Sequence, residues 1–162
     1  MALATTRAEW SPDASPNGKR LAFASDQSGS YEIWSSDLAG ADLIRHTAFQ
    51  EPLVSTPRWA PNSRKLIFDA RPDGSADLYL VGAESRLPRR LTTDSSDELN
   101  GSWSRDGAWI YYGSNRTGAW QIWKMPSGGG ASIQVTGQGG FNALEGVEGR
   151  FLYYTKHDAK AI

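Results

Sequence analysis

The sequence predicts an all-β protein built from about four copies of one structural unit. Its 162 residues contain four related segments in which a short turn precedes an apolar strand. The fourth residues of these turns are Gly18, Ser63, Gly107 and Gly149, which lie 45, 44 and 42 residues apart. This period matches a blade of four strands and exceeds that of ankyrin or tetratricopeptide units. The repeat therefore predicts a β-propeller of four-stranded antiparallel blades.

Residues 100–123 are the clearest copy of the unit. A first strand ends at Trp103, and the turn at 104–107 contains the aspartate and glycine that tight hairpins favour. Two strands rich in aromatic and β-branched residues follow at 110–112 and 120–123, separated by a polar loop. The copy thus predicts three strands in succession, and a fourth follows after a glycine turn.

The other copies repeat this order with different residues. Polar loops between the second and third strands are predicted at 25–29, 69–74 and 114–118. Polar fourth strands are predicted at 43–47, 90–92 and 133–136. Charged residues in an outer strand protect the edge of a sheet against pairing with other chains.

The four units divide the chain into blades at about 7–50, 51–95, 96–138 and 139–162. Residues 1–6 include Leu-Ala-Thr-Thr, which is similar to the fourth strand of blade 2, so we expect them to complete the last blade of the same chain or of another copy. Such pairing removes free sheet edges. The chain is therefore expected to be a closed ring of about four blades, a fragment of a larger protein, or half of a ring formed by two copies.

Composition limits the classes of partner. Apolar residues make up 39% of the chain and aromatic residues 11%, which is typical of a globular domain. Seven tryptophans in a repeating chain are expected mainly to fill the space between sheets. The net charge of −1 gives no field for nucleic acid or for an anionic membrane. The sequence contains no signal peptide, no run that could span a bilayer and no cysteine, and it leaves the cellular compartment open.

The turn and strand motifs resemble those of the TolB-type propeller repeats, relatives of the tryptophan–aspartate repeats. The similarity is clearest at Pro57-Arg58-Trp59-Ala60-Pro61 and at Trp103-Ser104-Arg105-Asp106-Gly107. The resemblance implies blades like those of TolB, of prolyl-oligopeptidase-like peptidases and of sensor regions in bacterial transcriptional regulators; residues 128–156 look especially like the last group. The chain departs from the pattern in its number of blades, at Ser63, and at Val147-Glu148.

Catalytic motifs are incomplete. The segment around Asp106 resembles the Asp-box of sialidases but is shorter, and aspartate with glycine is what a hairpin turn requires in any case. The two histidines, His46 and His157, have no acid or serine at a spacing that suggests a triad, and the chain has no Gly-x-Ser-x-Gly elbow. His46 lies in a predicted outer strand, where we expect it to be exposed. No cofactor or metal site is predicted.

Two further clusters have simple structural interpretations. The glycines at 128–130 and 137–140 lack the lysine and the strand-to-helix context of a phosphate loop, so flexible turns are expected. The basic residues Arg86, Arg89 and Arg90 could meet an acidic partner, but a charged outer strand explains them more simply.

Binding residues are predicted at two places, because propellers use the mouth of the channel and the loops of one face. The register of the inner strands suggests four channel residues: Arg58, Asn100, Ser102 and Asn142. The recurring polar loops suggest four more: Asp26, Arg71, Asn115 and Arg116. Aspartate, asparagine and serine are also ordinary turn residues, so both sets have a structural alternative.

The sequence therefore favours a non-catalytic scaffold that binds a protein or a small ligand, and that self-associates through incomplete terminal blades, with two copies closing one ring. Alternatives are a propeller that binds or cleaves glycans, and the propeller domain of a larger regulator or peptidase. A glycosidase would need two positioned carboxylates, and the acidic residues here recur in turns.

Overall fold

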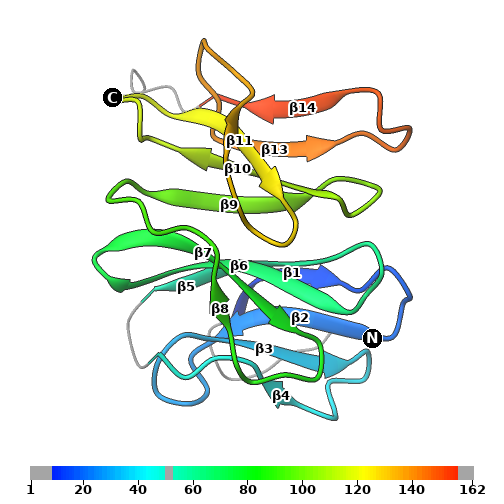
Figure 1. Ribbon diagram of the computed structural model, residues 1–162. Coiled ribbons are helices and arrows are strands. Elements are labelled where there is room, and N and C mark those ends of the chain that lie inside the picture. Colours follow the sequence, from blue (N-terminus) through cyan, green and yellow to red (C-terminus); the bar gives the residue numbers. More distant parts are fainter. Residues whose placement is uncertain (1–8, 50–52, 157–162) are drawn as a thin grey trace.

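The structure is a computed structural model that describes residues 9–49 and 53–156. The described chain forms four antiparallel sheets, three with four strands and one with two (Figure 1). Blade 1 contains β1 (Glu9–Ala14), β2 (Arg20–Ser25), β3 (Glu32–Asp37) and β4 (Ile44–Arg45). Blade 2 contains β5 (Val54–Trp59), β6 (Lys65–Asp73), β7 (Ser75–Gly82) and β8 (Arg89–Arg90). Blade 3 contains β9 (Glu98–Trp103), β10 (Trp109–Ser114), β11 (Gln121–Pro126) and β12 (Ile133–Gln134), and blade 4 contains β13 (Asn142–Glu145) and β14 (Leu152–Thr155).

The blades are stacked in chain order, from blade 1 at the bottom of Figure 1 to blade 4 at the top. Their first strands meet along the inner side of the stack, where β1 contacts β5, β5 contacts β9 and β9 contacts β13. Within the described residues, blades 1 and 4 therefore lie at opposite ends of a row. The strand predicted at residues 1–6 lies outside the described residues. The described chain contains no helix that is long and apolar enough to cross a membrane.

The strand order predicted from the repeat is confirmed, with two differences. Residues 69–74, predicted as a loop, continue β6 to Asp73, and β7 begins at Ser75. Asp97 holds this extension, because its Oδ1 accepts hydrogen bonds from the guanidinium of Arg71 at 2.7 Å and from the backbone N–H of Ala76 at 2.9 Å. The fourth strands are two residues long, shorter than predicted.

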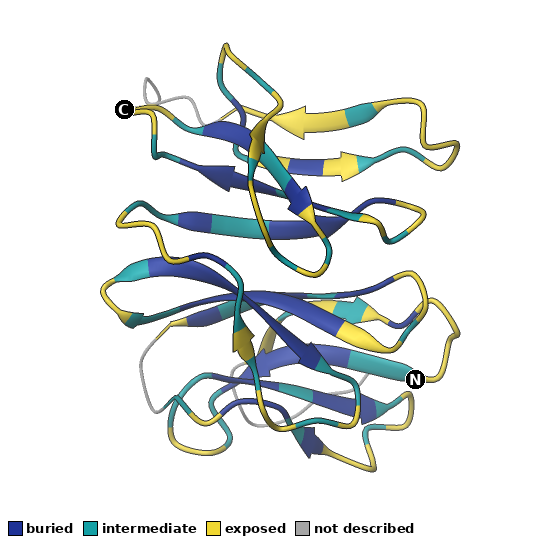
Figure 2. Ribbon diagram, viewed as in Figure 1, coloured by how far each residue is buried: buried dark blue, intermediate teal, exposed yellow. Residues whose placement is uncertain are grey.

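Buried residues are concentrated in the strands of the inner blades (Figure 2), and apolar side chains pack between neighbouring blades. Ala22, Ala24 and Ile33 of blade 1 pack against the face of blade 2 that carries Leu66 and Phe68. The opposite face of blade 2 packs against blade 3 through a second cluster. Burial of this apolar surface is the main force that holds the blades together.

Two tryptophans at the ends of first strands join neighbouring blades, which agrees with the expectation that tryptophans fill the space between sheets. Trp59 and Trp103 are only 5% and 9% exposed. The Nε1–H of Trp59 donates to the carbonyl of Asp13 at 3.1 Å, and that of Trp103 donates to the carbonyl of Arg58 at 3.1 Å. Each of these indole groups thus bonds the first strand of the preceding blade. Trp10, in contrast, is 44% exposed on the free side of blade 1.

A threonine joins the third and fourth strands in each four-stranded blade. In blade 2, Oγ1 of Thr92 accepts from the N–H of Leu78 at 3.0 Å and donates to the buried carboxylate of Asp77 at 2.8 Å. Arg90 donates to Asp77 and also to the carbonyl of Thr92 at 2.9 Å. The equivalent threonines are Thr47 in blade 1 and Thr136 in blade 3. Side-chain hydrogen bonds therefore reinforce the few backbone bonds that the short fourth strand makes.

The exposure predicted for His46 is wrong, because the side chain is fully buried. Its Nε2 lies 2.9 Å from Oγ of Ser35, and its Nδ1 lies 3.0 Å from the carbonyl oxygen of Ser85. The imidazole thus bridges blade 1 to a loop of blade 2, which the position in an outer strand did not predict. Burial lowers the pKa of His46, so the ring is held in its neutral form. His157 lies outside the described residues.

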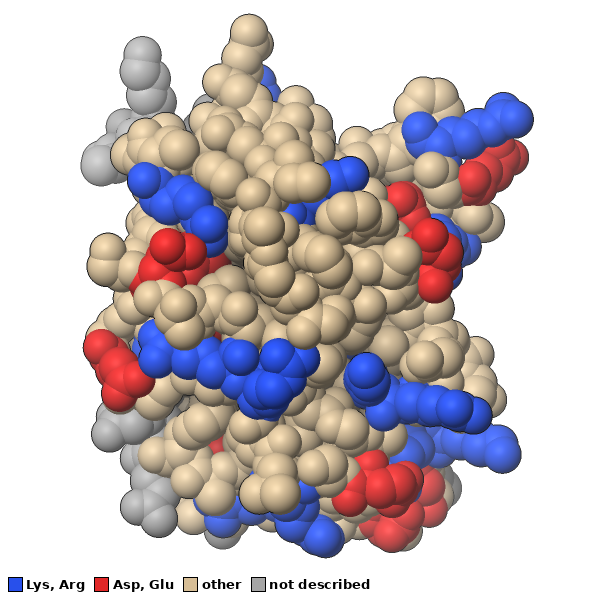
Figure 3. All heavy atoms as spheres, viewed as in Figure 1, with Lys and Arg blue, Asp and Glu red and all other residues tan. Residues whose placement is uncertain are grey.

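The basic cluster predicted near Pro88 lies on the outer strand of blade 2. Arg90 pairs with Asp73 and Asp77, whereas Arg86 and Arg89 are exposed. Figure 3 shows basic side chains across the middle of this face with acidic ones beside them. Mixed charges of this kind suit the simple interpretation of a solvated outer edge.

Candidate binding site at the inner strands

The four predicted channel residues line one cleft. Arg58, Asn100, Ser102 and Asn142 border a cleft of about 550 Å³ on the inner side of the stack. Its walls come from all four blades, because Asp13 of β1 also contributes. The register of the repeat therefore brings these residues together as predicted, while their role in binding stays a prediction.

A β-bulge shapes the inner strand of each four-stranded blade. The pairing of the first and second strands shifts register in all three of these blades. At each bulge a residue other than glycine has a positive φ, namely Ser11 at 51°, Thr56 at 48° and Asn100 at 57°. Residues that carry a side chain rarely adopt this left-handed backbone conformation, and backbone strain of this kind is concentrated at functional sites. Thr56 and Asn100 both line the cleft, and so does Asn142, the equivalent residue of blade 4.

Asp69 supports two of these bulges from within the core. Its carboxylate is buried and accepts hydrogen bonds from the hydroxyl groups of Ser55 (2.5 Å) and Thr56. It also accepts from the backbone N–H of Asn100 at 3.2 Å. Burial raises the pKa of Asp69, although these three donors act in the opposite direction. One side chain thus contacts the bulges of both blades, through hydroxyl groups in blade 2 and through a backbone N–H in blade 3.

The acidic groups of the cleft are engaged by the protein itself. Oδ2 of Asp13 accepts from the backbone N–H of Trp59 at 2.7 Å, and burial raises the pKa of this carboxyl. Glu145 accepts from the N–H of Arg105 at 2.6 Å and from the hydroxyl of Tyr111 at 3.1 Å. Burial and the neighbouring Glu145 raise the pKa of Tyr111 to about 12. These contacts join blade 1 to blade 2 and blade 3 to blade 4.

Of the four predicted channel residues, Ser102 is also engaged, because its hydroxyl donates to the carbonyl of Ala143 at 2.7 Å, whereas the other three have groups available to a ligand. The guanidinium of Arg58, which is half-buried, donates one hydrogen bond, to the carbonyl of Pro57 at 2.8 Å, and makes no ion pair within the described chain. The carboxamides of Asn100 and Asn142 make no hydrogen bond to any described residue. The cleft therefore offers one half-buried cation, Arg58, beside the exposed Arg105, and two groups that can each donate and accept hydrogen bonds.

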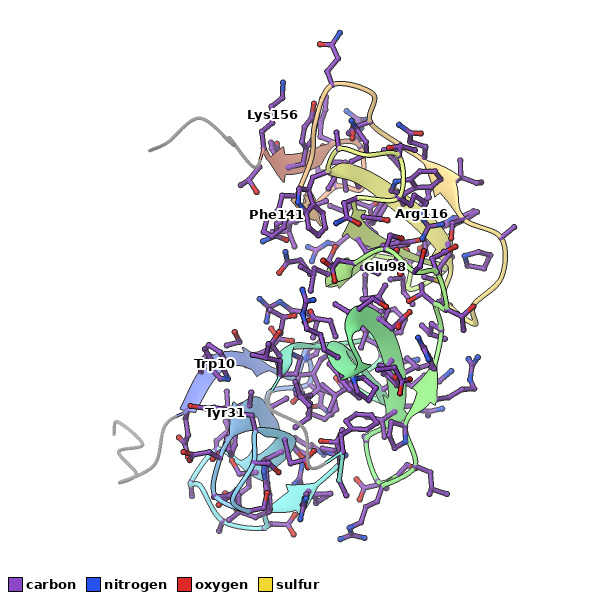
Figure 4. The ribbon with its side chains drawn as sticks, turned by 90° about the vertical axis from the view of Figure 1, so that its left-hand side faces the viewer. Trp10, Tyr31, Glu98, Arg116, Phe141 and Lys156 are labelled. Atoms are coloured by element: carbon purple, nitrogen blue, oxygen red, sulfur yellow. The ribbon has the colours of Figure 1, made fainter. Side chains whose placement is uncertain are left out.

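Three of the four predicted loop residues are engaged by the protein itself, and one of them, Arg71, joins blade 2 to blade 3. Arg71 lies in β6 rather than in a loop, and its guanidinium pairs with Asp97 at 2.7 Å. The N–H of Asp97 donates to the side chain of Asn115 at 2.9 Å. Arg116 pairs with Glu98 at 3.2 Å and lies over the ring of Trp123, 4.7 Å from its centroid. Figure 4 shows Glu98 and Arg116 side by side on this face.

Asp26, the fourth predicted loop residue, lies apart from this network in blade 1. Its Oδ1 is buried and has no hydrogen-bond partner among the described residues. Its carbonyl accepts from the N–H of Gly29 at 2.8 Å, as expected of a turn. The loop face therefore has fewer free polar groups than the inner cleft has.

Asp106 acts as the turn residue that the sequence indicated. Its Oδ1 accepts from the hydroxyl of Ser104 at 2.6 Å and from the N–H of Ala108 at 2.9 Å, and the hydroxyl bond is the main reason that its pKa is lowered. Asn17 makes the same bonds in blade 1. Within the described chain, no three His, Asp or Glu side chains are grouped so that they could hold a metal ion.

The cleft residues that the sequence did not indicate include Asp13, Thr56, Arg105 and Glu145. The repeat contains the signal for two of them, because Asp13 lies 45 residues before Arg58, and Thr56 lies 44 residues before Asn100. Arg105 and Glu145 have no such signal. Arg105 lies in a turn, and Glu145 lies in the fourth copy of the repeat, which departs most from the pattern.

Comparison with known proteins agrees with this architecture. The TolB from Helicobacter hepaticus, a Tol-Pal system protein, is 31% identical over 97 residues, which are 60% of this chain and 23% of that protein. The TolB from Xylella fastidiosa is 33% identical over 93 residues, or 57% of this chain and 21% of that protein. The chain thus spans less than a quarter of the length of these two relatives.

Solved structures show the same fold. The crystal structure of TolB from Acinetobacter baumannii matches with a TM-score of 0.79 and 22% identity, over 98% of this chain and 40% of that one. A puromycin hydrolase matches with a TM-score of 0.65 and 17% identity, over 82% of this chain and 23% of the hydrolase. The sequence pattern of the TolB beta propeller domain matches residues 2–162. The chain therefore belongs to the TolB beta propeller domain family.

Proposed function

We propose that this chain is a non-catalytic propeller scaffold that binds a segment of a partner protein in the cleft at its inner strands. One observation carries the proposal: the first strands of all four blades line one cleft, and the free polar groups of Arg58, Asn100 and Asn142 border it. Loops and channel mouths carry function in propellers because the strands are committed to packing. The backbone N–H of Asn100 is bonded to Asp69, so the fold fixes the place of its carboxamide in the cleft.

The relatives support a role in protein interaction in a general way. The bacterial TolB proteins are named as parts of the Tol-Pal system, and this chain matches less than a quarter of their length. The puromycin hydrolase shares only the fold at 17% identity, so its hydrolase activity gives no support for catalysis here.

A peptide library displayed on phage tests the proposal. We expect the immobilised chain to enrich peptides whose binding is lost in Asn142→Trp, since Asn142 is exposed and a tryptophan there would fill the cleft without changing the core. The matched control is Thr117→Trp, at an exposed position of the loop face, which should bind the same peptides as the wild type. Enriched peptides that bind Asn142→Trp equally well, or a failure to enrich any, would contradict the proposal.

We further propose that two copies associate head to tail, because both ends of the stack expose apolar faces. Blade 4 is largely exposed (Figure 2), and its Leu144, Phe151 and Tyr153 are each more than 60% exposed. Blade 1 has a hollow of about 300 Å³ lined by Leu21 and Phe23, among others. Exposed apolar side chains that are grouped in this way are typical of interaction sites.

The repeat indicates what covers these faces. Leu21 and Phe23 are the equivalents, 45 residues earlier, of Leu66 and Phe68, which pack against blade 1 inside the stack. The free face of blade 1 is therefore built like a face that receives a preceding blade. A second copy can supply that blade from its own blade 4, and two such contacts would close a ring of about eight blades.

Light scattering coupled to size-exclusion chromatography tests the association. We expect a mass near twice 17.7 kDa for the wild type, and a monomer for Tyr153→Glu. Leu87→Glu is the control, because Leu87 is 84% exposed at the outer edge of blade 2 and should not change the mass. A compact wild-type monomer at every concentration would rule out the association and leave the cleft proposal intact.

A further inference from the structure

We propose that the inner cleft recognises a carboxylate, and therefore an acidic segment of the partner, through Arg58. This inference rests on the proposed function, because it names the chemistry of the segment that the cleft takes. It depends on one arginine that differs from all comparable ones in the described chain.

The arginines that are partly buried in the described residues have carboxylate partners, with one exception. The paired ones are Arg20, Arg45, Arg71, Arg90 and Arg116, which bind Asp42, Glu32, Asp97, Asp77 and Glu98 respectively. Arg58 is the exception, since it is half-buried and its guanidinium donates only to the carbonyl of Pro57. Elsewhere, this protein neutralises a partly buried guanidinium with its own carboxylate.

The nearest acid in the cleft does not take this role. Asp13 makes no ion pair with Arg58, and its Oδ2 is bonded to the backbone N–H of Trp59. Burial raises the pKa of Asp13, and the positive charge of Arg58 lowers it only in part. Glu145 is likewise bonded to Arg105 and Tyr111. Both carboxylates are thus oriented by the blades, and the donors of Arg58 stay available.

A guanidinium of this kind suits a carboxylate in particular. Arginine presents planar, paired N–H donors that match the two oxygens of a carboxylate, and its charge does not change with pH. Asn100 and Asn142 line the same cleft and can bond the peptide groups on either side of an acidic residue, because each carboxamide both donates and accepts. The set therefore fits an extended acidic peptide, with Arg58 as the residue that sets specificity.

Two synthetic peptides test the inference on the full chain. One alternates aspartate with alanine, and the other has the same length with asparagine in place of aspartate. We expect the aspartate peptide to bind the wild type about tenfold more tightly, which is typical of a hydrogen-bonded ion pair. In Arg58→Gln this preference should vanish, and in Arg58→Lys it should be reduced but not lost.

Arg64→Gln is the matched control, because Arg64 is an exposed arginine of the same blade that does not line the cleft. It should keep the full preference for aspartate, which separates Arg58 from general attraction by surface charge. Competition by inorganic phosphate distinguishes a carboxylate site from a general anion site: phosphate should displace the aspartate peptide no better than sodium acetate does.

The outcomes separate this inference from the proposed function. If phage-selected peptides bind wild type and not Asn142→Trp, but the aspartate preference is absent or persists in Arg58→Gln, the cleft binds peptides and the carboxylate inference is wrong. Strong displacement by phosphate alone would also overturn it. If instead the aspartate preference depends on Arg58 while Asn142→Trp has no effect on any peptide, Arg58 acts outside the proposed cleft and the proposed function fails.

Discussion

Oδ1 of Asp69 accepts a hydrogen bond of 3.2 Å from the backbone N–H of Asn100, and this bond joins the core of blade 2 to the bulged inner strand of blade 3. The carboxylate also holds Thr56 at the bulge of its own blade. No other four-stranded blade has an acid at this position, where blade 1 has Ala24 and blade 3 has Gly113. Asp69 is therefore a departure from the repeat that serves the cleft.

We predict that Asp69 makes the protein less stable as the pH rises. Burial raises its pKa in the folded state above the ordinary carboxyl value of about 3.9. A group shifted this way binds its proton more tightly when folded, so its stabilising contribution is complete below that ordinary value and is lost as pH rises through the folded pKa. Asp69→Asn should flatten this decline in urea unfolding between acid and neutral pH, whereas Asp69→Ala should cost about 2–3 kcal/mol because it leaves donors unpaired.

Asp106 provides a control with the opposite sign. Hydrogen bonds in its turn lower its pKa, so its contribution is present at neutral pH and is lost as the pH falls. Asp106→Asn should therefore change the acid side of the stability profile and leave the slope due to Asp69 unaltered. If the stability of Asp69→Asn falls with rising pH as steeply as that of the wild type, the Asp69 carboxyl is not the source of the decline.

We predict that the contact between the third and fourth strands contributes more to stability in blade 2 than in blade 3. The reason is that the contact in blade 2 includes an ion pair. Arg90 bonds the buried carboxylate of Asp77, whereas in blade 3 the equivalent residues are Gln134 and the neutral Gln121. Arg90→Met should cost about 2–3 kcal/mol, since a buried carboxylate loses its charged partner, and Gln134→Met should cost about 1 kcal/mol. Equal losses in chemical denaturation would contradict this explanation.

We predict that a single methyl group at Gly113 weakens the contact between blades 3 and 4. A Cβ there would overlap the carbonyl oxygen of Phe141, which is backbone and cannot easily move. Gly113→Ala should cost about 1–3 kcal/mol through overpacking. Gly128→Ala is the control, because a Cβ at Gly128 meets no atom within 4 Å. Thermal unfolding followed by circular dichroism compares the two variants, and a neutral Gly113→Ala would mean that blade 4 packs less closely than described.

The sequence predicted the blades well because their turns are local. The Asp-Gly pair at Asp106 and Gly107 forms its bonds within a few residues, so the pattern alone indicates the hairpin. The register of the repeat also placed Arg58, Asn100 and Asn142 correctly on one cleft.

Contacts between blades could not be predicted in the same way. His46 is buried by a carbonyl from the next blade, that of Ser85, and no pattern around His46 indicates this partner. Arg71 looked like a free loop residue, but its guanidinium bonds Asp97 of blade 3, a residue that the repeat does not distinguish. Long-range hydrogen bonds of this kind depend on the relative placement of blades, which the period of a repeat does not specify.

The most direct test of the account is a nuclear magnetic resonance titration of the ¹⁵N-labelled chain with a phage-selected peptide. The account predicts that the backbone amides of Thr56, Asn100 and Asn142 shift together, because these equivalent residues of three blades line one cleft. The amides of Asn115 and Gly128 should stay unchanged. Shifts confined to the loops around Asn115, with the inner strands unaffected, would contradict the account.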